Sequence, residues 1–88
     1  MNYKEFKIAG ILISDELKDI NTIQDILTSY GNIIRSRLGI NDPVENPQIK
    51  GLIILDLVGD PGEIKNLLNE INEIKGIQIK EMEFEDFI

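Results

Sequence analysis

The segment Leu52–Val58 constrains the fold most, because six of its seven residues are apolar. Successive residues of a β-strand point to opposite sides of a sheet, so this run predicts a strand that is covered on both sides. The rest of the chain offers two amphipathic helical segments, which can cover one side. The simplest cover for the other side is a second copy of the chain. We therefore expect a homo-oligomer.

The composition excludes several classes of function. The 88 residues include 16 acidic and 9 basic ones, for a net charge of −7. Nucleic acids and anionic membranes both bind clustered basic residues, so neither is an expected partner. The chain has no cysteine and no histidine, which excludes disulfides, thiolate nucleophiles, Cys/His metal sites and Ser-His-Asp triads. We expect no metal and no cofactor.

Length and hydropathy indicate one small domain, residues 1–88, in the cytoplasm. A chain of 88 residues matches the size of a single domain. The segment Met1–Glu5 is too polar for a signal peptide, and no apolar run approaches the ~18 residues of a membrane span.

The hydrophobic pattern predicts four strands and two helices in the order β-α-β-β-α-β. The predicted elements are a strand Phe6–Ile13, a helix Asn21–Tyr30, strands Ile33–Ile40 and Lys50–Val58, a helix that follows Asp60, and a strand that begins at Ile77. This order is that of the split βαβ, an α+β, ferredoxin-like arrangement. It predicts a four-stranded antiparallel sheet with both helices on one face.

Local signals place the helix ends. Asn21 and Gln24 resemble a capping box for the first helix, although the helix could also begin earlier, near Asp15. For the second helix, Asp60 is a good N-cap, Pro61 occupies a position where its missing N–H costs nothing, and Glu63 complements the helix dipole. Gly31 and Gly76 are expected to end the two helices.

The two central strands are apolar on both faces. One set of alternating residues is expected under the helices: Ala9, Ile11, Ile13, Ile53, Leu55 and Leu57. The opposite set is expected on the open face: Phe6, Ile8, Leu12, Leu52, Ile54 and Val58. Exposed on a monomer, the second set would form a larger apolar patch than soluble proteins usually tolerate.

Asp56 is the charged residue in this open set, and a carboxylate among apolar side chains needs a partner. Arg35 or Arg37 on the neighbouring strand could reach it. One interpretation is an ordinary ion pair, within a subunit or between subunits. The other is an effector contact in which Arg37 grips a carboxylate or phosphate.

The end of the chain alternates acidic with large apolar residues. In the last strand, the apolar positions change parity at Met82 and Phe84, which predicts either a bulge or a change of role. Phe84, Phe87 and Ile88 are costly to leave in water, so we expect this segment to dock on a neighbour.

No recognisable motif joins a nucleophile to a base, so we expect no enzymatic activity. The free N–H groups after Asp60 could hold an anion, but Asp60 and Glu63 would repel it, and helix capping is the favoured interpretation. Asp60–Glu63 also looks like a turn that ACT domains use for small molecules, although those domains carry it after the first strand.

Three short motifs carry a resemblance to a known family: Arg37–Ile40, Gly51–Leu55 and Ile74–Lys80. Together they make the chain similar to the iron-only hydrogenase system regulators of anaerobic bacteria. The resemblance implies an ACT-like fold, similar to the C-terminal domain of the nickel-responsive regulator, and a regulatory module that assembles as a dimer or tetramer. Asn41 stands where family members often have proline. Nickel sensing is not implied, because histidine and cysteine are absent, and neither is DNA binding, because the ribbon-helix-helix domain is missing.

The sequence thus predicts a regulatory, ACT-like domain that oligomerises and binds a small effector or a partner protein. The alternative is a purely structural protein-docking module without a small-molecule ligand. If an effector binds, the candidate residues are Arg37, Gly39 and Asp56 at the subunit interface, and secondarily Asp60 and Gly62.

Overall fold

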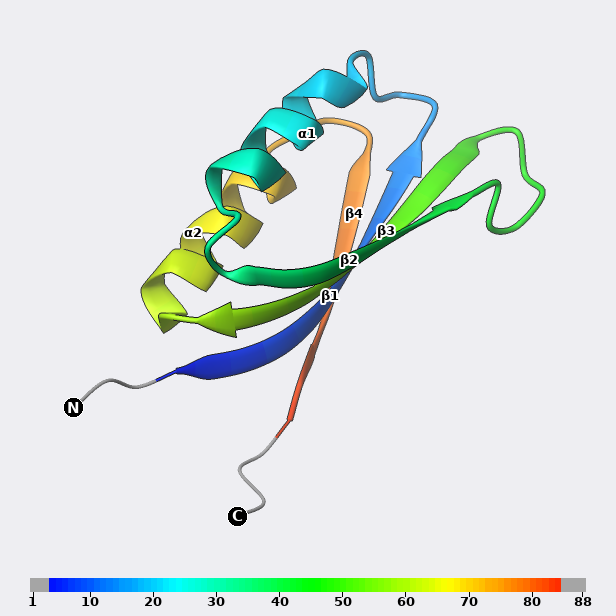
Figure 1. The fold of residues 1–88 in the computed structure, drawn as a ribbon. Helices are drawn as coiled ribbons and strands as arrows, with labels where there is room; N and C mark the ends of the chain where they lie inside the picture. The colour runs from blue at the N-terminus through cyan, green and yellow to red at the C-terminus, as the bar shows by residue number, and fades with distance from the viewer. Residues whose placement is uncertain (1–3, 85–88) are drawn as a thin grey trace.

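The computed structural model describes residues 4–84, which form a four-stranded antiparallel sheet and two helices (Figure 1). The elements are β1 (Glu5–Ser14), α1 (Ile20–Ser29), β2 (Ile34–Asn41), β3 (Ile49–Gly59), α2 (Pro61–Asn72) and β4 (Ile77–Glu83). The strand order is β2-β3-β1-β4, and both helices cover the same face of the sheet (Figure 1). The predicted ferredoxin-like βαββαβ fold is confirmed.

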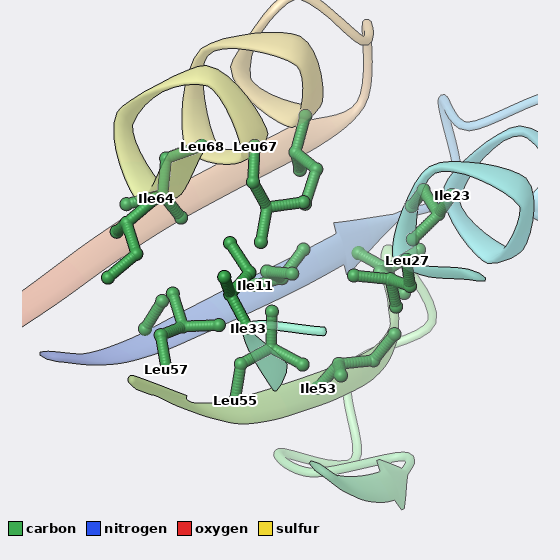
Figure 2. Packing of buried hydrophobic residues seen from close by; sticks show 13 residues of the cluster. Ile11, Ile23, Leu27, Ile33, Ile53, Leu55, Leu57, Ile64, Leu67 and Leu68 are labelled. Carbon is green, nitrogen blue, oxygen red and sulfur yellow. The ribbon is translucent and has the colours of Figure 1, made fainter. Parts of the chain in front are cut away.

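The core lies between the helices and the two central strands, β1 and β3. Ala9 pairs with Leu55 and Ile11 with Ile53, so their side chains share the helix side of the sheet. Figure 2 shows this layer packed against α1 and α2. The buried side chains from the helices are Ile23 and Leu27 of α1 and Ile64, Leu67, Leu68 and Ile71 of α2. Each large apolar side chain that is fully buried here contributes about 1.5–3 kcal/mol, which explains why the alternation in β1 and β3 sets the fold.

Each helix begins at an aspartate. The Asp60 carboxylate accepts a hydrogen bond from the Glu63 N–H at 3.1 Å, as predicted. Helix α1 begins one residue earlier than expected, because the carboxylate of Asp19 accepts from the Asn21 N–H at 2.9 Å. The predicted Asn21 capping box is therefore wrong. Asp19 is extended (φ −143°) and supplies a charged acceptor one turn before the first buried residue.

Gly76 joins the start of β4 to the end of β1. Its φ of +93° favours glycine, and a Cβ at this position would lie 2.5 Å from the backbone nitrogen of Leu17. Its carbonyl accepts hydrogen bonds from the N–H (2.9 Å) and the hydroxyl (3.0 Å) of Ser14. Helix α2 already ends at Asn72, so Gly76 shapes the loop after the helix instead of ending the helix itself.

A bulge in β2 changes the predicted faces of that strand. Ile34 pairs with Leu57, but Ser36 pairs with Asp56, so Arg35 is an extra residue without a partner in the register. The bulge places Ile34 on the helix side, whereas Leu38, opposite Ile54, lies on the open face. Strict alternation along the sequence predicts that Ile34, Leu38 and Ile40 share one face, and this prediction is wrong.

Strand β4, in contrast to β2, pairs without a bulge. Its register with β1 runs without interruption from Ile77 to Glu83, so the change of parity involves no bulge there. Ile79 pairs with Ile11 on the helix side, and Met82 pairs with Ile8 on the open face. The change of parity therefore marks a change of role, which was the second of the two predicted explanations.

Candidate functional site

The open face of the sheet is largely apolar from one edge to the other. Leu38 on edge strand β2 and Met82 on edge strand β4 are each 57% exposed. Between them lie the predicted open-face residues, in register across β1 and β3: Phe6, Ile8, Leu12, Leu52, Ile54 and Val58. Figure 1 shows both helices on the other side of the sheet, so no element between residues 4 and 84 covers this face. The face is wider than predicted, because the bulge in β2 adds Leu38 and Ile40 to it.

Charge on this face is paired at its centre. The Arg35 Nε lies 3.0 Å from Oδ2 of Asp56, and its Nη2 donates to Oδ1 at 3.4 Å. The Ser36 hydroxyl adds a third hydrogen bond to Asp56, at 3.3 Å. The guanidinium also lies over the ring of Phe6, 5.7 Å from the centroid. The predicted partner of Asp56 is thus Arg35 and not Arg37. The bulge turns the Arg35 side chain toward the open face, where it reaches Asp56.

Aromatic stacking extends the same cluster to the end of the described chain. The rings of Phe6 and Phe84 are 5.3 Å apart and nearly parallel, at an interplanar angle of 17°. Phe84 therefore packs on its own sheet. The predicted docking residues Phe87 and Ile88 lie outside the described residues.

Arg37 and Gly39 lie on the opposite side of the sheet from Asp56. The Nη2 of Arg37 donates to Oε1 of Gln24 on α1 at 2.8 Å, and Gly39 pairs with Ile53. Both residues line a cavity of about 520 Å³ beside the start of α1. The structure therefore brings Arg37 and Gly39 together but separates them from Asp56 by the thickness of the sheet.

Asp60 and Gly62 form the first turn of α2, and their polar groups serve the helix. The Glu63 N–H, which an anion would need, already donates to the Asp60 carboxylate. Glu63 in turn accepts a hydrogen bond from the side-chain amide of Asn32 at 2.8 Å. This geometry is that of a capped helix, with two carboxylates where an anionic ligand would have to approach.

Lys7 is a buried charge that sequence reasoning did not single out. Its side chain is on the helix side of β1, only 8% of the residue is exposed, and its Nζ lies 3.0 Å from Glu81, 3.0 Å from Glu83 and 3.4 Å from Glu5. Burial by itself lowers the pKa of Lys7, but the hydrogen bonds and charges of the three carboxylates outweigh burial and raise that pKa above its ordinary value. The sequence does indicate this burial, since Lys7 alternates in step with Ala9 and Ile11 and so faces the same, helix side of the strand. The cluster fastens edge strand β4 to β1.

The strand order and the two helices on one face define a ferredoxin-like βαββαβ protein whose other sheet face is apolar and uncovered within residues 4–84. Residues 5–81 match the family described as "TM1266-like: Iron-only hydrogenase system regulator, putative", and the chain belongs to this family. The family resemblance inferred from the three sequence motifs is therefore confirmed.

The solved structures similar to this chain include the following two. The uncharacterized protein TM1266 from Thermotoga maritima is 25% identical, with 94% of this chain and 100% of that chain covered and a TM-score of 0.80. The apo form of CPII, a nitrogen regulatory PII-like protein from Thiomonas intermedia K12, is 13% identical, with 96% and 92% of the two chains covered and a TM-score of 0.55. The second likeness shows the fold alone. No functionally curated protein matches the sequence.

Within residues 4–84, no helix is long and apolar enough to cross a membrane.

Proposed function

We propose that this protein is a non-enzymatic regulatory module that assembles with copies of itself through the open face of its sheet. The observation that carries the proposal is the exposure of large apolar side chains across that face, from Leu38 at one edge to Met82 at the other. Monomeric soluble proteins rarely expose a continuous apolar patch of more than a few hundred Å², whereas this face presents apolar side chains on all four strands.

Charge on the face supports a second copy as the occupant. The net charge of −7 would oppose self-association if the acidic residues lay on the contact surface. On the open face, Asp56 is already paired with Arg35, and Lys80, opposite Gly10, adds a positive charge. Glu81 and Glu83, opposite Ala9 and Lys7, lie on the helix side. Two open faces can therefore meet without repulsion between carboxylates.

A twofold arrangement is the simplest assembly, because it lets the same surface serve on both subunits. A small effector would act by binding one state of assembly more tightly than another. Membership in a family of regulators supports a response of this kind.

Sedimentation velocity of the purified full chain over a dilution series tests the assembly. We expect a dimer or tetramer at micromolar concentration that dissociates on dilution. A single monomeric species throughout the series would overturn the proposal. The chain could also assemble with a dissociation constant that no small molecule from the host's metabolite pool changes. That outcome would favour the purely structural docking module.

A further inference from the structure

The cavity beside α1 exists because two strands lack side chains at the same place. Gly39 of β2 and Gly51 of β3 both lie on the helix side, two register positions apart, since Gly39 pairs with Ile53 and Asn41 with Gly51. A Cβ at Gly39 would meet no atom within 4 Å. The result is a cavity of about 520 Å³ at the end of the sheet where β1 ends and the β2–β3 connection turns (Figure 1). Small-molecule sites usually occupy about 300–1,000 Å³.

The charge of this cavity is the reverse of the charge of the chain. Its lining includes Lys18, Arg37 and Lys50 but no aspartate or glutamate. The whole chain, by contrast, has 16 acidic residues against 9 basic ones. Within the described part of the chain, none of these three cations has a carboxylate oxygen within 4.0 Å. Arg37 is held instead by the neutral amide of Gln24, which orients its guanidinium without cancelling its charge.

The carboxylates of the adjoining loop are not part of the lining. Asp19 caps α1 through the Asn21 N–H, and Glu16 faces Lys75 at 3.9 Å. Asp15, the third acidic residue of this loop, does not line the cavity either. The positive charge of the cavity is therefore left for a ligand.

The remaining lining has the mixed character of a site for an organic molecule. Apolar surface comes from Ile13, Leu17 and Ile53, and uncharged polar groups come from Ser14, Gln24 and Asn41. Apolar walls with a few convergent polar groups are typical of small-molecule sites.

We propose that this cavity binds a small organic anion, one that carries a phosphate or carboxylate group together with an apolar part. Arg37 presents a planar fork of donors that suits phosphate and carboxylate oxygens, and Lys18 and Lys50 add charge at the same opening. The apolar part of the ligand lies against Leu17 and Ile53. This inference rests on the proposed regulatory role, for which it supplies the chemical class of the effector.

Titrations followed by the amide signals of Gly39 and Gly51 in ¹H–¹⁵N spectra of the full chain test this site. Three probes separate the possible sources of affinity: AMP carries a phosphate and an aromatic base, citrate carries carboxylates alone, and adenosine is the uncharged counterpart of AMP. We expect saturable shifts at both glycines with AMP or citrate, and none with adenosine. A response to AMP assigns a phosphate with an apolar body, whereas a response to citrate alone assigns carboxylates and overturns the apolar part of the proposal. Absence of saturable shifts with both anions at millimolar concentration, or an equal response to adenosine, overturns the site.

Two variants and a matched control localise the binding. Arg37→Gln removes one charge-assisted contact and should weaken binding roughly tenfold. Gly39→Val fills the cavity from a position where a Cβ meets no neighbour, so it should abolish binding while the rest of the spectrum is preserved. Lys65→Gln removes an exposed cation on α2, away from the cavity, and should leave binding unchanged. An equal loss in Arg37→Gln and Lys65→Gln would mean attraction to overall charge and would overturn the site.

Failure of this inference is distinguishable from failure of the proposed assembly. Sedimentation without any probe reports self-association alone. A monomer that binds AMP supports the anion site and overturns the proposed assembly. An oligomer that binds neither anion supports the assembly and overturns the anion site.

Discussion

Replacing Leu38 by glutamate should separate the subunits without unfolding them. Leu38 is 57% exposed on an edge strand, so the fold of one subunit depends little on it. Full burial of a leucine side chain contributes about 1.5–3 kcal/mol, and the exposed 57% corresponds to about 1–1.7 kcal/mol. In a twofold dimer Leu38 occurs twice, so the two side chains together contribute about 2–3 kcal/mol to the free energy of association. Leu38→Glu should therefore raise the dissociation constant at least about 30-fold, before the cost of burying a carboxylate is added.

Val44 offers a matched control for this substitution. It lies between β2 and β3, outside the sheet, and is 61% exposed. Val44→Glu changes the net charge by the same amount but leaves the open face intact. Sedimentation equilibrium of the wild type and both variants, at equal ionic strength, should show weakened assembly for Leu38→Glu alone. Thermal unfolding of each variant at low concentration checks that the subunit fold is retained.

Met82 provides a second test from the opposite edge of the sheet. It is also 57% exposed and lies opposite Ile8, so Met82→Glu should weaken assembly to a similar extent. If Leu38→Glu and Met82→Glu both assemble as tightly as Val44→Glu, the open face is not the contact surface and the argument from exposed apolar area fails.

Two further predictions concern stability and can be checked by urea denaturation. Gly76→Ala should cost about 3–5 kcal/mol, because a Cβ would lie 2.5 Å from the Leu17 nitrogen at a φ of +93°, whereas Gly39→Ala, in open space, should be nearly neutral. Lys7→Met should cost about 1–2 kcal/mol at neutral pH, because three carboxylates lose their cation. Since the pKa of Lys7 is raised in the fold, the stability advantage of the wild type over Lys7→Met is complete at neutral pH. As the pH rises from 7, this advantage should shrink only above about pH 10.4, where lysine in the unfolded chain loses its proton. A decline of the advantage between neutral pH and that value, or a Gly39→Ala variant as unstable as Gly76→Ala, would contradict these explanations.

The central strands could be predicted because period-two alternation is sufficient to orient them. Ile11 and Leu55 are both fully buried where the alternation places them, and no local irregularity interrupts the pairing of these two residues with their partners. Asp60 could likewise be predicted as a cap, because aspartate followed by proline begins helices for a local reason that tertiary contacts do not alter.

The faces of β2 could not be predicted, because one inserted residue reverses the alternation. The bulge at Arg35 has no glycine to mark it, and strict alternation places Ile34, Leu38 and Ile40 on one face, so the pattern gives no sign of the inserted residue. That single irregularity decides that Arg35, and not Arg37, meets Asp56. It also moves Arg37 to the helix side, where it reaches Gln24.

The cavity was foreseen only in part, because it depends on register. The sequence singled out Arg37 and Gly39, but nothing local indicates that Gly51 lies beside Gly39, or that Lys18 and Lys50 meet at the same opening. Those neighbours come from the β2–β3 pairing and from the loop before α1, which the order of elements alone does not specify.

Strand β2 joins the two proposed activities, because its alternate residues serve opposite sides of the sheet. Arg37 and Gly39 line the cavity, whereas Leu38 lies on the open face. A ligand that holds Arg37 also fixes the backbone that positions Leu38. Ligand binding in the cavity and self-association through the open face can therefore be energetically coupled. Thermodynamic linkage requires that coupling to be reciprocal: if AMP tightens assembly by some factor, assembly must tighten AMP binding by the same factor. Two constants should be measured: the dissociation constant of the subunits with and without AMP, and the dissociation constant of AMP for the dissociated and for the assembled protein. Together they would show whether the cavity regulates assembly. A ratio of one in both directions would mean that the cavity binds its anion without any regulatory effect on assembly.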